Sequence, residues 1–195
     1  MRQPGGRRRT GVGDLARLVP PAVGPGGGGG WLCNLHGLRK PTWFAHSFLH
    51  RLGSEELVND DAQSWVCRED DRVQALIYDH SFPEQDAHDQ EYFIRDVPAS
   101  ATEGVELRLA GLAPGSCSLR LTRVGYRAND LFAGWHDLGC HDRLSGEDVA
   151  ALERLTDGSP QPVERVMVEA DETFRRHLDL RRNDLLFVEL DPLDG

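Results

Sequence analysis

The 195-residue sequence has no run of about eighteen apolar residues, the length that a helix needs to cross a bilayer, so no membrane-spanning helix is expected. Its four cysteines, Cys33, Cys67, Cys117 and Cys140, are far apart and form no Cys-x-x-Cys pair. We therefore expect reduced thiols, a cytoplasmic protein and no zinc site. Basic residues are also fewer than acidic ones, 22 Lys and Arg against 32 Asp and Glu. The formal net charge of -10 argues against a nucleic-acid partner, because phosphate contacts need a basic surface.

Motifs for nucleophilic or metal-assisted chemistry are missing as well. No nucleophile elbow or catalytic triad surrounds Ser116, Ser145 or the histidines. Two segments hold residue types found at metal sites, namely His136, Asp137, Cys140, His141 and Asp142 in one, and Asp86, His88 and Asp89 in the other. Neither segment has the spacing of a standard zinc site or a recognisable calcium loop. We expect solvated polar loops, no metal and no cofactor.

Residues 1–30 differ in composition from the rest of the chain. They contain three consecutive arginines, Arg7 to Arg9, several prolines and an unbroken glycine run from Gly26 to Gly30. A secretory signal is not indicated, because the apolar stretch 15–23 is interrupted by Arg17 and two prolines. A basic patch for nucleic acid is one alternative, but an Arg/Gly/Pro-rich segment of this length predicts a disordered tail.

Residues 31–53 have the pattern of one strand followed by one helix. The apolar stretch 31–35 is too short for a helix and precedes a Gly-containing turn, so it predicts a strand. Pro41 suits the first position of a helix. Apolar side chains then recur on one face of that helix: Phe44, Phe48 and Leu52, with Ala45 and Leu49 beside them. Gly53 is expected to end the helix in a left-handed conformation.

The remaining sequence predicts an antiparallel β-sandwich over residues 61–192, after a polar connector at 54–61. Apolar residues alternate with polar ones in runs at 63–68, 72–79, 92–97, 105–109, 117–124, 163–168, 173–180 and 185–190. Residues 72–79 are apolar on both faces and predict a central strand. Residues 125–139 read as a long loop. One helix is expected after Ser145, which begins a capping box, with Val149, Leu152 and Leu155 as its buried stripe.

Several motifs together resemble a known enzyme family. The segment GLRKPTWFAHSFLHRLG at 37–53, with LCN just before it, resembles the last strand and helix of the catalytic barrel in glycoside hydrolase family 39, the β-xylosidase family, and its bacterial branch above all. RVGYRAND at 123–130, the Leu144-Ser145 helix start and LRRND at 180–184 are similar to that family's C-terminal region, in the same order. The matches cover most of residues 31–190. The resemblance therefore implies the last β/α unit of a truncated TIM barrel (31–53) followed by a mainly β accessory sandwich (61–192).

The resemblance also implies retaining hydrolysis of O-glycosyl bonds in carbohydrate metabolism, with two carboxylates on the fourth and seventh barrel strands. One of them lies in an Asn-Glu-Pro setting. This sequence contains no Asn-Glu-Pro and no glutamate before Glu55, so we expect the chain alone to be inactive. In place of upstream barrel strands it has the tail 1–30, which suggests a truncated or frame-shifted gene or a wrong start codon. Part of the sandwich is also expected to be missing, which would leave one sheet with an open edge.

Two groups of residues are candidates for binding. Trp31, Asn34 and His36 would lie near the catalytic face of a full-length barrel, where a xylan-type oligosaccharide binds. Their alternative roles are to fill the barrel mouth and to satisfy loop backbone. The second group belongs to the 123–135 region: Arg123, Tyr126, Arg127, Asp130 and Trp135. It is either a domain or subunit contact, which a homo-oligomer could use, or a loop held by its own ion pairs.

Two further functions stay open. A free-standing carbohydrate-binding or protein-interaction module is the alternative to a glycosidase part. Such modules usually expose a row of aromatic residues, whereas aromatic residues are 7% of this sequence and fall mostly in loops or core positions. A non-functional fragment is the third possibility. In that case the face formed by Phe44, Phe48 and Leu52 would be exposed and promote aggregation.

Overall fold

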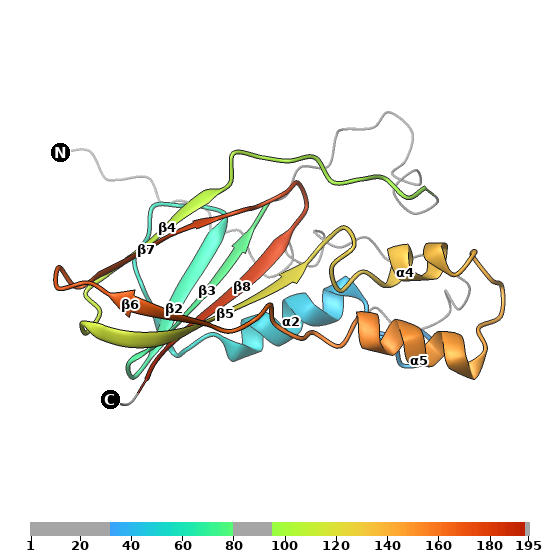
Figure 1. Cartoon of the computed structure of the whole chain (residues 1–195), viewed down its shortest axis with the longest axis horizontal. Helices are drawn as coiled ribbons and strands as arrows, with labels where there is room; N and C mark the ends of the chain where they lie inside the picture. The colour runs from blue at the N-terminus through green and yellow to red at the C-terminus, as the bar shows by residue number, and fades with distance from the viewer. Residues whose placement is uncertain (1–31, 80–94, 194–195) are drawn as a thin grey trace, which may run out of the picture.

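The computed structural model describes residues 32–79 and 95–193, which contain three helices and eight strands (Figure 1). The helices are α2 (Pro41–Arg51), α4 (Leu131–Asp137) and α5 (Gly146–Leu155). The strands are β1 (Glu55–Glu56), β2 (Ser64–Glu69), β3 (Arg72–Tyr78), β4 (Val105–Ala110), β5 (Gly115–Val124), β6 (Glu164–Val168), β7 (Thr173–Leu178) and β8 (Leu185–Pro192).

The strands form two antiparallel sheets of unequal size. The larger sheet has six strands in the order β1-β2-β3-β8-β5-β6, and the smaller has two, β4 and β7. Strand β8 lies between β3 and β5 and pairs with both along most of its length. The mainly β, antiparallel fold predicted from the sequence is therefore confirmed.

The main core lies between the two sheets. In β4, Leu107 and Leu109 are buried against it, while Glu106 and Arg108, which alternate with them, are exposed, as the alternation predicts. Strand β3 is buried from Val73 to Tyr78, so it is central, and both of its faces are covered. Its side chains belong to two different clusters. Val73, Ala75 and Ile77 lie in the core between the sheets, and Leu76 and Tyr78 lie in the cluster on the opposite face.

Helix α2 covers that opposite face of the larger sheet. Phe44 and Phe48 are each 1% exposed and pack with Leu76 of β3 and Phe187 of β8. The apolar face predicted for the helix is thus confirmed. The expectation that this face would be exposed in a fragment is wrong, because the sheet offers it an apolar surface within the same chain.

The region before α2 differs from the prediction. Residues 32–39 form a turn closed by a single bridge between Cys33 and Arg39, where a strand at 31–35 was expected. Among the described residues no strand lies beside this segment. The Cys33–Arg39 bridge therefore stays isolated and no longer strand forms. Gly53 is not in the left-handed region; it is needed because a Cβ there would lie 2.4 Å from the carbonyl oxygen of Arg68.

The region after β5 also differs, because α4 lies where a loop was predicted. The missed helix is short, and its start signal is the single N-cap Asp130, which accepts bonds from the backbone N–H groups of Phe132 and Ala133. In α5 the capping box of Ser145 and Asp148 forms as predicted, and Leu152 is fully buried. The predicted buried stripe is too wide, since Leu155 is 56% exposed.

Residues 95–97 are not a strand, and the rest of the run predicted at 92–97 lies outside the described residues, as do Asp86, His88 and Asp89. No helix among the described residues is long and apolar enough to cross a membrane. All four cysteines are free; Cys67 and Cys117 are buried, and burial raises the pKa of both thiols.

Candidate domain-contact site

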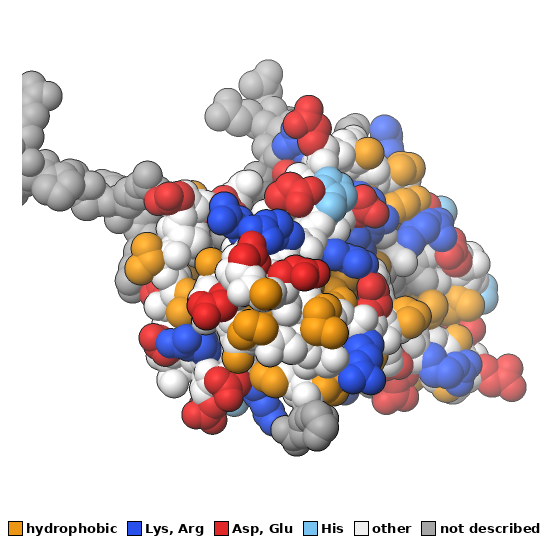
Figure 2. All heavy atoms as spheres, turned by 60° about the vertical axis from the view of Figure 1, so that its left-hand side comes forward, with side chains coloured by type: hydrophobic (Ala, Val, Ile, Leu, Met, Phe, Trp, Pro, Cys, Tyr) orange, Lys and Arg blue, Asp and Glu red, His pale blue; other side chains and the backbone are white. Residues whose placement is uncertain are grey.

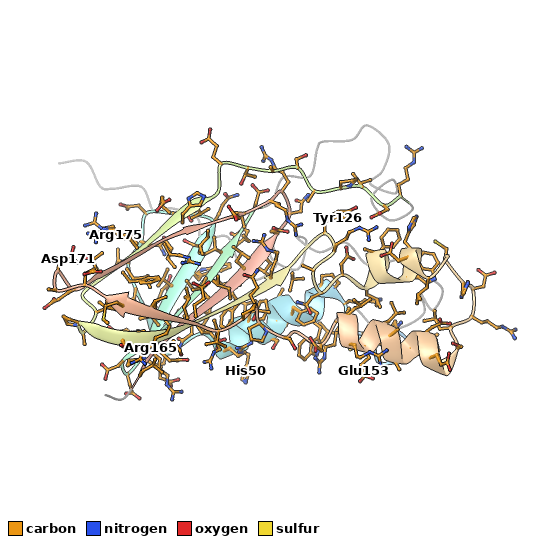
Figure 3. The ribbon with its side chains drawn as sticks, in the orientation of Figure 1. His50, Tyr126, Glu153, Arg165, Asp171 and Arg175 are labelled. Carbon is orange, nitrogen blue, oxygen red and sulfur yellow. The ribbon has the colours of Figure 1, made fainter. Side chains whose placement is uncertain are left out.

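The candidate site lies at the end of the sandwich that carries α4, where the chain leaves β5 (Figure 3, near Tyr126). Gly125 and Ala128 bond each other's backbone in a tight turn. Arg127 and Asn129 have left-handed backbones, with φ of 56° and 51°. Side-chain bonds hold Asn129: its amide donates to the carbonyl of Arg123 at 2.8 Å and accepts from the N–H of Gly158 at 2.9 Å.

The Arg123 side chain bonds to other residues of the same chain. Its guanidinium pairs with Asp184 and donates to the carbonyl oxygen of Asp179 at 2.6 Å. The Asp184 side chain is fully buried and is bonded a second time by Arg181, with Nε 2.9 Å from Oδ2. Gly125 makes room for this carboxylate, because a Cβ there would lie 2.0 Å from Asp184 Oδ1. These contacts match the loop-holding alternative for Arg123.

Arg127 is 43% exposed and bridges three segments. Its guanidinium donates to Asp137 of α4 at 2.7 Å and to Asp96 at 2.7 Å, and its Nε donates to the Tyr126 hydroxyl at 3.0 Å. Hydrogen bonds to Asp137, Tyr126 and Asp96 raise the pKa of Arg127 above its usual range. In turn, the bond from Arg127 lowers the pKa of Asp137.

Asp130 is a structural residue of the same turn. One carboxylate oxygen caps α4, and the other accepts the N–H of Arg127 at 3.1 Å. Burial raises the pKa of Asp130, and the bonds from these backbone N–H groups oppose the rise without cancelling it. These carboxylate bonds all come from backbone N–H groups, which gives Asp130 a structural role in the turn and in the start of α4.

Trp135 is half-buried on α4, and its ring lies 5.9 Å from that of Phe132. The indole N–H donates to the carbonyl oxygen of His141 at 3.0 Å, which ties the α4–α5 loop back to α4. Phe132 also lies 6.4 Å from the ring of His136, which is exposed. Within the predicted contact group, Tyr126 and Trp135 are partly exposed and the Arg127 side chain is exposed.

The histidine, cysteine and aspartate residues of the 136–142 segment do not come together as a set of metal ligands. Asp137 is bonded by Arg127, and His141 lies 3.8 Å from Asp148 in the α5 capping box. Nowhere in residues 32–79 and 95–193 do three or more histidine, cysteine or carboxylate side chains form a group that could hold a metal.

Of the residues predicted to lie near a sugar, Trp31 is outside the described part of the chain. Asn34 accepts the N–H groups of His36 and Leu38 at 2.9 and 3.0 Å, so it satisfies loop backbone, the alternative role given for it. His36 is exposed. The structure does not bring these residues to the 123–135 region.

Sequence reasoning missed Asp96, Asp137 and Asp184 as members of the site. The motif LRRND holds Asp184, but its link to Arg123 spans 61 residues and has no local signal.

Comparison with solved structures identifies the class of protein. The fold matches the GH39 enzyme from Xanthomonas axonopodis pv. citri, with a TM-score of 0.80 and 31% identity over 89% of this chain. It also matches a monomeric β-xylosidase from Caulobacter crescentus CB15 (TM-score 0.80, 35% identity, 90% of this chain) and a GH39 β-xylosidase from Caulobacter crescentus (0.66, 31%, 89%). No family model and no curated protein sequence matches.

These matches show that this mainly β chain shares its fold with part of glycoside hydrolase structures. The relationship to glycoside hydrolase family 39 that the motifs predict is confirmed, and it concerns a C-terminal part of such a protein. The chain spans about a third of the length of the matched structures, covering 34%, 35% and 32% of them.

Proposed function

We propose that this chain is the non-catalytic, C-terminal accessory part of a retaining, β-xylosidase-like glycoside hydrolase. The observation that carries the proposal is the match over about nine-tenths of this chain but only about a third of the matched enzymes. Hydrolysis of O-glycosyl bonds in a xylan-type oligosaccharide would then depend on residues outside this chain. The free thiols fit a cytoplasmic protein.

The carboxylates of the candidate site support an inactive role. A retaining glycosidase needs a general acid with a raised pKa beside a second free carboxylate. Asp137 has a lowered pKa, because Arg127 donates to it. Asp130 has a raised pKa but directs its oxygens at backbone N–H groups. Asp137 is held by Arg127 and Asp130 by backbone N–H groups, so the two do not form a free acid and nucleophile pair.

The accessible part of the 123–135 region is then the surface offered to the catalytic barrel. Tyr126, Arg127 and Trp135 are partly exposed and combine aromatic rings with a guanidinium, a composition enriched at protein contacts. Arg123 and Asp130 would act indirectly, by holding the turn and α4 in place. Leu32 and Leu35, 40% and 68% exposed, offer apolar area close to the residues that resemble the barrel.

Hydrolysis of an aryl β-xyloside by the purified chain tests this proposal. We expect no turnover above a protein-free blank. Turnover that survives rigorous purification would place a catalytic pair within these residues and overturn it. Titration with xylo-oligosaccharides separates the alternative, because saturable binding without turnover would favour a carbohydrate-binding module.

A further inference from the structure

On its side away from β7, strand β4 pairs with no other described strand. Its one hydrogen-bonded neighbour in the described residues is β7, which pairs with it from Val105 opposite Leu178 to Ala110 opposite Thr173. The smaller sheet therefore ends at β4. An edge of this kind presents a row of free N–H and C=O groups to any strand that can lie beside it.

The outward side chains of β4 alternate in charge. Glu106 and Arg108 are both exposed on the face that points away from the core, and Leu107 between them points inward. Because facing residues in an antiparallel pair share one face of the sheet, only registers that keep Leu107 on the core side are compatible with this pattern.

We propose that a second copy of this chain pairs with the β4 edge, antiparallel and centred on Leu107. In this register Glu106 of each copy lies opposite Arg108 of the other, and Val105 lies opposite Leu109 on the core side. Shifting the centre to Glu106 would place two glutamates opposite each other, and shifting it to Arg108 would oppose two arginines. Charge thus favours this register over the two neighbouring ones that also keep the faces matched.

A second observation supports the same partner. Within the chain, Arg108 lies directly opposite Arg175 of β7, a like-charge pair that disfavours the sheet. Asp171 is bonded to Arg175 at 2.9 Å and feels the charge of Arg108, so it serves two arginines. Glu106 of a second copy would supply the missing carboxylate, while keeping its own bond to His177.

The described edges at β7 and β6 lack this self-complementarity. Strand β7 carries Arg175, Arg176 and His177 in sequence, so a second β7 would meet like charges. Strand β6, at the edge of the larger sheet, has Arg165 as its central outward charge and would oppose it to itself or to Met167. Figure 2 turns the end with β4, β6 and β7 forward and shows charges of both signs interspersed over it.

A single added strand buries less than the roughly 1,200 Å² of a standard stable interface, so the association should be weak and concentration-dependent. It concerns this chain by itself, because in a full-length enzyme the part of the sandwich that the sequence predicts to be missing would compete for an open edge of this kind. It would also distinguish this chain from the Caulobacter β-xylosidase described as monomeric, which is about three times as long.

Sedimentation equilibrium of the full chain tests the proposal, over concentrations from about 10 µM to about 1 mM. We expect the average mass to rise toward twice that of the monomer. Glu106→Arg and Arg108→Glu each oppose like charges across the interface and should weaken association about tenfold or more. The double exchange, Glu106→Arg with Arg108→Glu, restores opposite charges and should recover it. Arg165→Glu on β6 is the matched control and should change nothing.

Circular dichroism confirms that each variant keeps its sheet content. A mass that stays monomeric throughout the range overturns the proposal. So does a dimer that both single variants leave intact, or a double exchange that is no better than the single ones.

Discussion

The ring of Phe48 on α2 stacks on that of Phe187 in β8, with centroids 4.8 Å apart and planes 4° from parallel. Arg51 lies over the Phe187 ring at 4.6 Å and pairs with Glu189 of the same strand. The helix that resembles part of a barrel is therefore attached to the middle strand of the sandwich. Its apolar face belongs to the same folding unit as the sheet.

Replacing Phe48 by alanine should destabilise the chain by about 3–5 kcal/mol, because the ring is 1% exposed and the cavity would lie between helix and sheet. Urea unfolding followed by circular dichroism measures the change. His46, exposed on the same helix, is the control, and His46→Ala should stay within about 0.5 kcal/mol of the parent. A small effect at Phe48 would mean that α2 is not part of the cooperative unit.

Gly125→Ala should cost about 2–5 kcal/mol. The added Cβ would lie 2.0 Å from Asp184 Oδ1 and push a fully buried carboxylate away from Arg123 and Arg181. Gly146→Ala is the matched control, since nothing lies within 4 Å of its Cβ and the position is helical. Its stability in urea should equal or exceed that of the parent. Equal stability of both variants would show that the Asp184 network can shift freely.

Arg127→Met tests the pH dependence of the α4 contact. Arg127 lowers the pKa of Asp137 from 3.8, so the ion pair stabilises the fold above the unfolded value and loses this effect as pH falls through the lower folded value. In the variant the pKa of Asp137 should return toward 3.8, as measured by carboxyl-carbon NMR. The stability gap between parent and variant should be constant above about pH 5 and close in more acidic solution.

Arg143→Met is the control for that experiment, because Arg143 is exposed on the α4–α5 loop. An unchanged Asp137 titration in Arg127→Met would refute the ion pair. A gap that widens on acidification would contradict the sign given above.

Ser145→Ala should destabilise the chain by about 1 kcal/mol, since it removes the cap of α5 and leaves the Asp148 N–H without its acceptor. Ser145→Thr keeps the hydroxyl and should recover most of the loss. Thermal unfolding at neutral pH measures both. If Thr were as damaging as Ala, the hydroxyl bond would not be the cause.

Elements with strong local signals were predictable from the sequence. Pro41 and the four-residue spacing of Phe44 and Phe48 locate α2, and the capping box locates α5. Alternation locates β4, because one face of that strand meets the core and the other meets solvent. Family motifs in the same order predicted the relationship that the solved structures confirm.

What escaped prediction depends on contacts distant in sequence. Helix α4 has only seven residues, and it is held by Asp130 and by the bond from Arg127 to Asp137 rather than by a long apolar stripe. Gly53 looked like a helix cap, yet it is required by the approach of Arg68 from β2. The strands divide into one sheet of six and one of two, depending on which strand pairs with which. The periodicity of the sequence does not specify these pairings.

The place of β8 has a consequence for synthesis. Strands β3 and β5 each bond to β8 and not to one another, so the middle of the larger sheet cannot close until residues 185–192 have been made. Until then a nascent chain on the ribosome would expose the unpaired edges of β3 and β5 and the uncovered aromatic rings of α2. Folding of this region is therefore delayed until translation has passed β8, and chaperones would have most to protect just before that point.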